Sequence, residues 1–167
     1  MSFNSVIIGT DGGCRGNQTE NNIGAYAAIL QFGEHEKEVS GIFKNTTNNK
    51  MEILAVTKAL QAMKRYDLPV ILYSDSAYVV NCINKQWYVN WRKNGWVKKN
   101  GDLVKNSDLW KELIDELEKF DDITILKVKG HSNHNLNNKV DALVNKTMDG
   151  YVNNKKGDSF GRNLERN

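Results

Sequence analysis

The chain lacks several features that would define other classes of protein. Its 167 residues include only two cysteines, Cys14 and Cys82, which are too few for a disulfide framework and lack the paired spacing of a zinc site. No apolar run approaches the ~18 residues needed to span a bilayer, and Met1 does not open a basic and then apolar segment like that of a secretory signal. We therefore expect a cytoplasmic protein with reduced thiols and no membrane association.

Proline is also scarce, with one residue in the chain, and no internal repeat is present. A composition of 40% hydrophobic and 26% charged residues is that of a globular protein with a sizeable core. We expect one domain over residues 1–149 that acts as a monomer. Residues 150–167 are polar and contain few apolar side chains, so we expect them to form a loosely held tail.

Two apolar segments lead into an acidic residue followed by small or polar residues. The first leads into Asp11 and two glycines, and the second, residues 68–74, leads into Asp75. A helical pattern between them predicts a crossover connection and parallel pairing of the two strands. Asp11 and Asp75 would then lie together at the carboxyl ends of these strands, and their repulsion would favour a bound cation. The alternative is that Asp11 only begins a turn after an edge strand.

The remaining patterns predict an α/β fold. Residues 23–32 and 35–43 are strand-like and are joined by a short turn, which predicts an antiparallel meander of the first three strands. Residues 46–63 combine N-cap residues with apolar residues at helical spacing. A further strand is expected at 123–128, and further helices at 77–83, 106–117 and 136–148.

Two more acids lie in comparable apolar settings. Glu52 stands between Met51 and Ile53 near the start of a mostly apolar helix, where it is either a solvated acid favoured by the helix N-terminus or a functional group. Asp141 lies near the start of the last helix, after a Gly-His pair. Carboxylates are hard ligands that suit Mg²⁺ or Mn²⁺ better than zinc, and four of them could hold two ions about 4 Å apart for displacement at phosphorus.

Basic residues gather in one segment, residues 85–105, which contains six bases against a single acid. Three of the four tryptophans, at positions 87, 91 and 96, are interleaved with these bases. One interpretation is that the tryptophans attach a helix to the domain. The other is a nucleic-acid groove, in which aromatic rings contact bases and sugars while Lys and Arg contact phosphates. The charge balance favours a polyanion as the partner of this segment.

Several short motifs occur in order along residues 5–148. They are Thr10-Asp11-Gly12-Gly13-Cys14-Arg15-Gly16-Asn17, Thr47-Asn48-Asn49-Lys50-Met51-Glu52, Tyr73-Ser74-Asp75-Ser76, the Trp/Lys segment 87–99, Asn106-Ser107-Asp108-Leu109-Trp110, and Val128-Lys129-Gly130-His131 with Asp141 further on. Together they resemble the type 1 ribonucleases H of bacteria. The resemblance implies a ribonuclease H-like fold, with a five-stranded mixed sheet flanked by helices and a basic helical protrusion at about residues 86–101.

The resemblance also implies an activity. Ribonucleases H hydrolyse the RNA strand of RNA–DNA hybrids to 5′-phosphate and 3′-hydroxyl ends by two-metal-ion catalysis, so the implied cofactor is two Mg²⁺ ions, with Mn²⁺ as a substitute, and the implied partner is the hybrid duplex. Asp11, Glu52, Asp75 and Asp141 match the metal-binding acids of the family, with Asp11 between the ions. His131 matches a loop histidine that assists proton movement or product departure.

Residues that would hold the hybrid follow from the same resemblance. Asn17, Asn48 and Asn49 match residues that contact the minor groove, where the 2′-hydroxyl distinguishes RNA from DNA. Thr47 and Asn106 match a pocket for a DNA phosphate. The matching residues of the basic protrusion are Trp87, Trp91, Arg92, Lys93, Trp96, Lys98 and Lys99.

Two features depart from the family pattern. Residues 18–22 lack a Pro-Gly-rich spacer, and Ala77 stands where a polar groove-reading residue is frequent. Two other functions stay open: a nuclease of the same superfold with a different substrate, such as a resolvase or transposase, and a catalytically silent hybrid-binding module. The groove-reading and protrusion motifs argue against the first, and the presence of all four acids argues against the second.

Overall fold

A computed structural model describes residues 5–16, 22–129 and 133–157, and its centre is one five-stranded sheet in the order β3-β2-β1-β4-β5. The strands are β1 (Val6–Arg15), β2 (Ile23–Phe32), β3 (His35–Lys44), β4 (Val70–Ser74) and β5 (Ile123–Lys127). β1, β2 and β3 pair antiparallel, whereas β4 pairs in parallel with both β1 and β5. The mixed sheet predicted from the sequence is confirmed.

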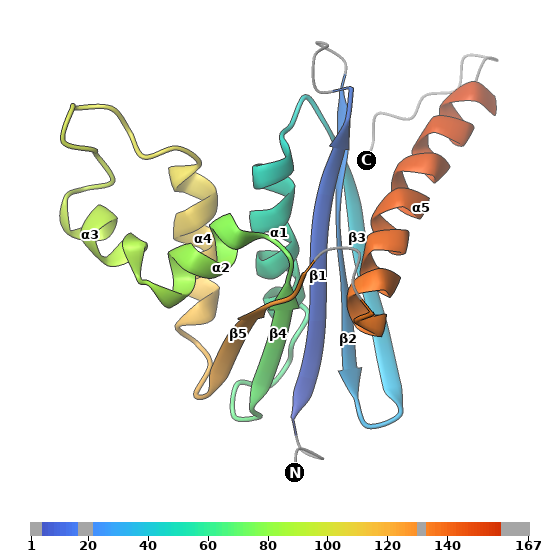
Figure 1. Ribbon diagram of the computed structural model, residues 1–167, viewed down its shortest axis with the longest axis horizontal. Coiled ribbons are helices and arrows are strands. Elements are labelled where there is room, and N and C mark those ends of the chain that lie inside the picture. Colours follow the sequence, from blue (N-terminus) through green and yellow to red (C-terminus); the bar gives the residue numbers. More distant parts are fainter. Residues whose placement is uncertain (1–4, 17–21, 130–132, 158–167) are drawn as a thin grey trace.

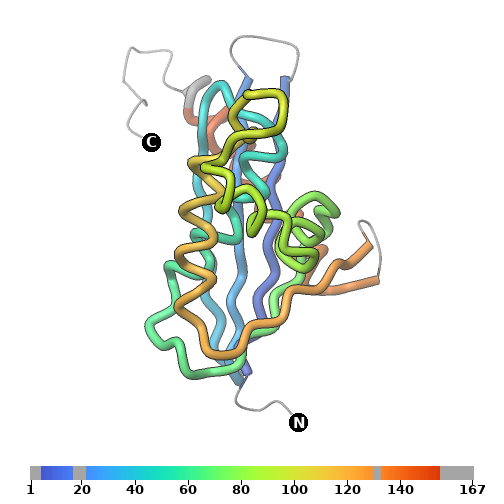
Figure 2. Tube along the Cα trace, turned by 90° about the vertical axis from the view of Figure 1, so that its left-hand side faces the viewer, coloured from blue at the N-terminus to red at the C-terminus, as the bar shows by residue number. Residues whose placement is uncertain are grey.

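Helices cover both faces of this sheet (Figure 1). On one face, α1 (Asn48–Gln61), α2 (Ala77–Asn84) and α4 (Ser107–Leu117) share one hydrophobic core with β1, β4 and β5. Figure 2 views the protein from the side of these helices and shows α4 running lengthwise along this helical layer. On the other face, α5 (Asn135–Gly157) packs against β1 and β2 through a second, smaller cluster that includes Leu136, Val140 and Val144. The sheet is therefore enclosed between two helical layers.

α1 is buried over most of its circumference. Thr47 caps its N-terminus, because the Thr47 hydroxyl accepts a hydrogen bond of 3.1 Å from the backbone N–H of Lys50. Ile53, Ala55 and Val56 are fully buried in the core behind the sheet. A helix packed on so many sides cannot shift without disturbing the core, so side chains carried by α1 are held rigidly.

One expectation from the sequence is wrong: Asp11 does not follow the end of its strand. β1 continues past it to Arg15, and residues 12–15 remain paired with β2 up to the pair Arg15–Ile23. Only the parallel pairing with β4 stops here, at the pair Thr10–Ser74. The two glycines at 12 and 13 resemble turn residues in the sequence, yet in the structure they extend the strand where its neighbour β4 has already ended.

The basic protrusion, residues 86–101, stands away from the sheet beside α4 (Figure 1). It begins at Gln86, whose φ of 56° lies in the left-handed region, and contains the short helix α3 (Trp87–Lys93). An isolated bridge between Val97 and Leu103 then closes a loop. Trp96 and Val104 return the chain to the hydrophobic core, so the loop is anchored at its base.

The C-terminal helix is longer than its apolar pattern. That pattern ends near Met148, but α5 continues to Gly157, with Tyr151 and Val152 half-buried. The division at residue 149 between a domain and a tail stays a prediction. Within the described part of the chain, no helix is both long and apolar enough to cross a membrane.

Candidate active site and substrate groove

Asp11 and Asp75 are brought together by the way β4 ends. Ser74, the last residue of β4, pairs with Thr10, so the next residue of each strand is an aspartate at the same edge of the sheet. Asp11 is buried, and its Oδ1 accepts a hydrogen bond of 2.9 Å from the backbone N–H of Gly12. The parallel pairing inferred from the sequence therefore places two carboxylates side by side.

Glu52 reaches the same place from α1 because Gly12 has no side chain. A Cβ at Gly12 would lie 2.4 Å from the carbonyl carbon of Met51 and 2.6 Å from the backbone nitrogen of Glu52, so the helix backbone rests directly on β1. α1 begins at Asn48, which puts Glu52 beyond the first turn. An interaction with the helix N-terminus therefore does not account for this acid.

The carboxylates of Asp11, Glu52 and Asp75 converge, with one oxygen from each lying within 4.8 Å of the others. Asp141, on α5, lies close enough to Asp11 to raise its pKa through both a side-chain hydrogen bond and its charge. Two neighbouring strands and one helix from each helical layer thus contribute acids to one place. Within the described residues, the four acids singled out in the sequence are neighbours.

Burial and mutual repulsion dominate the electrostatics of this acidic cluster, defined as Asp11, Glu52, Asp75 and Asp141. The pKa of Asp11 is raised to about 8, first by burial and then by the charge of Asp75, against the opposing effect of the Gly12 N–H. The pKa of Glu52 is also raised well above its ordinary value, first by burial and then by the charges of Asp11 and Asp75. Without a cation, Asp11 therefore favours its protonated form at neutral pH.

The acidic cluster fits a divalent cation. Glu52 as a residue is only half-buried, yet its Oε1 is fully buried and has no hydrogen-bond partner among the described residues. A buried oxygen without a donor is unfavourable unless something else satisfies it. Oxygen ligands at this spacing suit Mg²⁺ or Mn²⁺, and the described part of the chain adds no His or Cys to the group.

Two residues implied by the resemblance, Asn17 and His131, lie outside the described residues, so the structure says nothing of where they are. Of the other residues matched to the minor groove, Asn48 and Asn49 open α1 and are exposed. Ala77 is also exposed, at the first position of α2. The start of α1 therefore presents polar side chains to solvent near the acidic cluster.

A groove of about 570 Å³ lies between the start of α1 and the start of α4. Its floor includes Met51 and Leu54. Its rim includes Lys105 of the basic segment and two lysines that were given no role from the sequence, Lys44 and Lys50. Asn106, in the left-handed region with φ 62°, also lines it, and the buried Nδ2 of Asn106 has no partner among the described residues. An unpaired N–H donor among lysines is suited to an anion.

The tryptophans of the protrusion divide into two kinds. Trp96 is only 8% exposed, and Trp91 packs with its ring centroid 6.1 Å from both Trp96 and Trp110. These rings attach the protrusion to the domain, which was one of the two interpretations of the sequence. Trp87, at 38% exposed, is the tryptophan of the three that presents a large surface to a partner.

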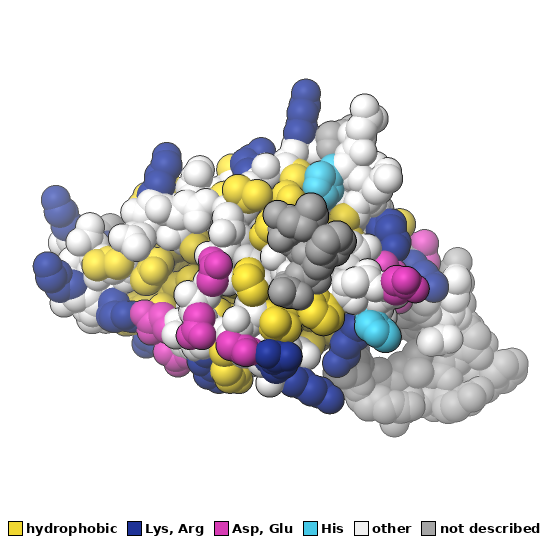
Figure 3. Space-filling view, turned by 90° about the horizontal axis from the view of Figure 1, so that it is seen from below, with side chains coloured by type: hydrophobic (Ala, Val, Ile, Leu, Met, Phe, Trp, Pro, Cys, Tyr) yellow, Lys and Arg dark blue, Asp and Glu magenta, His cyan; other side chains and the backbone are white. Residues whose placement is uncertain are grey.

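The cations of the protrusion also differ from one another. Arg92 forms an ion pair of 3.1 Å with Glu118, and its guanidinium lies 5.8 Å from the ring centre of Tyr88. Lys93, Lys98 and Lys99 are exposed. Figure 3 shows Lys and Arg side chains projecting at the side of the molecule on which Figure 1 places α3. The three lysines are therefore better placed than Arg92 to meet phosphates.

Several known proteins are similar to this chain in sequence. A family model described as RNase H matches residues 4–149. A ribonuclease H of Clostridium botulinum is 51% identical over 86% of this chain and 95% of its own length. One of Acetivibrio thermocellus is 49% identical over 83% of this chain and 91% of its own length. Residues 4–149, which the family model matches, include the acidic cluster and the groove.

Solved structures show the same fold. A type 1 ribonuclease H with the type 2 active-site motif matches with a TM-score of 0.77 and 24% identity, covering 90% of this chain and 74% of its own. A foamy viral protease-reverse transcriptase in complex with an RNA/DNA hybrid matches with a TM-score of 0.72 and 23% identity, covering 85% of this chain and 20% of its own. At such identities the likeness concerns the fold alone.

Fold and site together define the class: a ribonuclease H-like α/β domain with carboxylates gathered where the parallel pairing of β1 and β4 ends. Within that class, the chain belongs to the ribonuclease H family. It is a hydrolase, an endoribonuclease of a metal-dependent family that cleaves the RNA of RNA–DNA hybrids. The resemblance inferred from the sequence motifs is confirmed.

Proposed function

We propose that this chain cleaves the RNA strand of RNA–DNA hybrids to 5′-phosphate and 3′-hydroxyl ends by two-metal-ion catalysis. The observation that carries the proposal is the convergence of Asp11, Glu52 and Asp75 within 4.8 Å, with Asp141 beside Asp11. Two Mg²⁺ ions held by these four acids would supply an activated water and charge stabilisation at the scissile phosphate. Mn²⁺ has the same preference for oxygen ligands and is the expected substitute.

Asp11 has a proton to lose before it can act as a ligand. Because the pKa of Asp11 is about 8, its carboxyl group is largely protonated at neutral pH until a cation takes the place of the proton. The central position of Asp11, between Asp75 after β4, Glu52 on α1 and Asp141 on α5, supports its role as the acid shared by both ions. We propose that His131 moves a proton or assists product departure.

Recognition of the hybrid would extend from the acidic cluster to the protrusion. We propose that Asn17, Asn48 and Asn49 contact the minor groove at the RNA 2′-hydroxyls. Thr47 and Asn106 would hold a DNA phosphate. Asn106 lines the 570 Å³ groove, and its unpaired donor supports this role. In the protrusion, exposure favours Lys93, Lys98, Lys99 and Trp87 as contacts to the DNA strand, whereas Arg92, Trp91 and Trp96 would support them.

The experiment that tests this function compares four matched 5′-labelled substrates: an RNA/DNA hybrid, an RNA/RNA duplex, a DNA/DNA duplex and single-stranded RNA. Each is incubated with Mg²⁺ and, separately, with EDTA. We expect cutting only of the RNA in the hybrid, only with Mg²⁺, and 5′-phosphate and 3′-hydroxyl ends on the products. Equal cutting of all four substrates, or no cutting of the hybrid, would contradict the proposal.

A further inference from the structure

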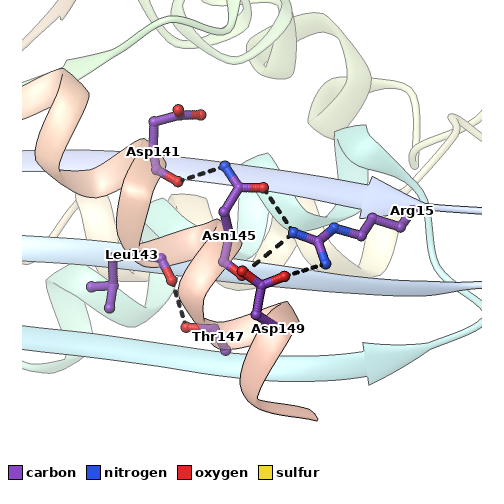
Figure 4. A network of polar contacts seen from close by, with 6 residues as sticks. All are labelled: Arg15, Asp141, Leu143, Asn145, Thr147 and Asp149. Carbon is purple, nitrogen blue, oxygen red and sulfur yellow. Dashed lines mark hydrogen bonds and ion pairs between the residues drawn. The ribbon is translucent and has the colours of Figure 1, made fainter. Parts of the chain in front are cut away.

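Arg15, at the end of β1, connects this strand to α5. Its Nη1 donates a hydrogen bond of 2.7 Å to Oδ1 of Asp149, and its Nη2 donates one of 3.1 Å to Oδ1 of Asn145 (Figure 4). The Asn145 side chain in turn donates from Nδ2 to the backbone oxygen of Asp141, at 3.1 Å. One chain of contacts therefore runs from Arg15 to the backbone of a residue of the acidic cluster.

β1 and α5 pack against each other along the stretch of the strand from Gly9 to Gly13. A Cβ at Gly9 would lie 2.7 Å from Cγ of Leu136, and one at Gly13 would lie 3.5 Å from Cγ1 of Val144. Because alternate residues of a strand face the same side, Asp11 faces α5 as well. The apolar contacts thus flank the place where Asp11 meets Asp141.

Two polar contacts join the strand to the helix. At the first, the carboxyl group of Asp11 meets that of Asp141. At the second, Arg15 attracts Asp149. From Asp11 to Arg15 the strand rises ~13 Å, and from Asp141 to Asp149 the helix rises ~12 Å, so the two contacts face each other in register. The contact of Arg15 with Asp149 and Asn145 therefore holds together the same strand and helix that carry Asp11 and Asp141.

We propose that Arg15 is a positioning residue for the metal site: through Asn145 and Asp149 it holds α5 against β1, so that Asp141 stays beside Asp11. The inference rests on the proposed function, because it assumes that Asp141 is a ligand. Arg15 does not touch the reacting atoms. Outer partners that orient ligands strengthen metal binding even though they make no bond to the ion.

A second ion pair supplies a matched control. Lys139, also on α5, donates to Oε1 of Glu36 on β3 at 2.9 Å, and the side chains of this pair are 49% and 36% exposed. The Arg15–Asp149 pair is 39% and 60% exposed. Both pairs therefore tie α5 to the sheet from the surface, but the described contacts link only Arg15 to the backbone of Asp141.

Binding of Mg²⁺ and Mn²⁺ to the full chain without substrate, measured by titration calorimetry, tests the proposal without reference to activity. We expect Arg15→Ala to weaken Mg²⁺ binding about tenfold, the lower end for outer-partner changes, because the contact is partly exposed. Arg15→Lys keeps a charge for Asp149 but loses the fork that also reaches Asn145, so we expect a smaller loss. Lys139→Ala should change affinity less than about twofold.

Coupling to Asp141 distinguishes positioning from general stability. In an Asp141→Asn background, Arg15→Ala should have no further effect on Mg²⁺ affinity, because the residue through which it acts no longer carries a charge. Unchanged affinity in Arg15→Ala, an equal loss in Lys139→Ala, or a full further loss in the Asp141→Asn background would each overturn the proposal. If Arg15→Ala does not fold, as judged by circular dichroism, Asn145→Ala replaces it, with the same expectations.

Loss of the metal site and loss of the Arg15 role would give different binding results. Wild-type chain that binds no divalent cation would overturn the proposed metal site and, with it, the role of Arg15. Normal wild-type binding that is insensitive to Arg15→Ala would overturn the role of Arg15 alone.

Discussion

The acidic cluster and the basic protrusion hold their charges in opposite ways. The carboxylates of Asp11, Glu52 and Asp75 lie within 4.8 Å of one another on a sheet and a core helix, whereas Lys93, Lys98 and Lys99 are exposed on a short helix and a loop. Like charges that are buried together raise one another's pKa, but exposed charges are screened by solvent and salt. The chemistry should therefore depend steeply on single acids, and binding only gradually on single lysines.

The largest effect is expected for Asp11→Asn. We expect hybrid cleavage to fall by roughly three orders of magnitude or more, since losing about 4 kcal/mol of transition-state stabilisation has that effect on the rate. Binding of the uncut hybrid should persist, because the protrusion and the groove are unchanged. Cleavage assays and filter binding on the same preparation measure the two quantities.

Asp121→Asn is the control for this change, because Asp121 is an exposed acid in the turn before β5. It should leave cleavage unchanged. Full activity in Asp11→Asn would remove Asp11 from the mechanism. Loss of hybrid binding in the same variant would mean that the acidic cluster also contributes to binding.

The pH dependence of stability tests the buried charge of the acidic cluster. The pKa of Asp11 is about 8 in the fold against an ordinary 3.8, so the unfolded chain loses this proton first as pH rises. Metal-free stability should then fall between about pH 4 and pH 8, by up to about 1.4 kcal/mol per pH unit from this group, and level off above pH 8. Urea unfolding at a series of pH values measures the slope.

Two comparisons isolate the contribution of Asp11 to this slope. Asp11→Asn should remove it, so the stability difference between variant and wild type should grow with pH over the same window. Added Mg²⁺ should reverse the trend in the wild type, because cation binding requires the ionised acids. A pH-independent difference between the two proteins would show that Asp11 titrates normally.

From the basic side, replacing Lys93, Lys98 and Lys99 together with Ala should raise KM roughly tenfold to a hundredfold at low salt and leave kcat nearly unchanged. The slope of log KM against log salt should fall by about 1 for each phosphate that the variant no longer neutralises. Steady-state kinetics at several salt concentrations measure both.

The matched variant removes three exposed lysines at the opposite end of the sheet: Lys37, Lys64 and Lys119. It has the same net charge as the first variant, so a purely global charge effect would appear in both. An unchanged salt slope in the protrusion variant would mean that its lysines are only solvated.

The smallest expected effect is at the groove between the two regions. Asn106 has φ 62°, so Asn106→Gly removes its side-chain amide without straining the backbone. We expect KM to rise about fivefold, the effect of one missing hydrogen bond of ~1 kcal/mol, with kcat unchanged. Stability of the free protein should not fall by the value of a hydrogen bond, because Nδ2 has no partner among the described residues. A large drop in melting temperature would contradict this role.

The sequence predicted well whatever depends on local pattern and strand order. Parallel pairing of β1 with β4 followed from the helix between them, and this pairing alone implied that Asp11 and Asp75 meet. Prediction from the sequence failed where the role of a residue depends on a residue that is distant in the chain but close in space. Gly12 and Gly13 looked like a turn, but their role is to continue β1 and to let α1 approach it.

Contacts between residues far apart in the chain could not be predicted from periodicity or composition. Arg15 meets Asp149 across 134 positions, and no periodicity signals such a pair. The tryptophans at 91 and 96 had the composition of a binding surface, yet Trp91 packs against both Trp96 and Trp110, and this packing decided their place. Composition therefore predicted the chemistry of the protrusion, while tertiary contacts determined which of its residues face outward.

The close packing of α1 on Gly12 also affects how rarely the acidic cluster is disrupted by unfolding. Because α1 is surrounded by core, its backbone amides should exchange with solvent deuterium only when the whole domain unfolds, whereas those of α3 should exchange through local opening. The carboxylate that Glu52 presents is thus as long-lived in its place as the fold itself. Local opening of α3 within that lifetime should leave Glu52 in place.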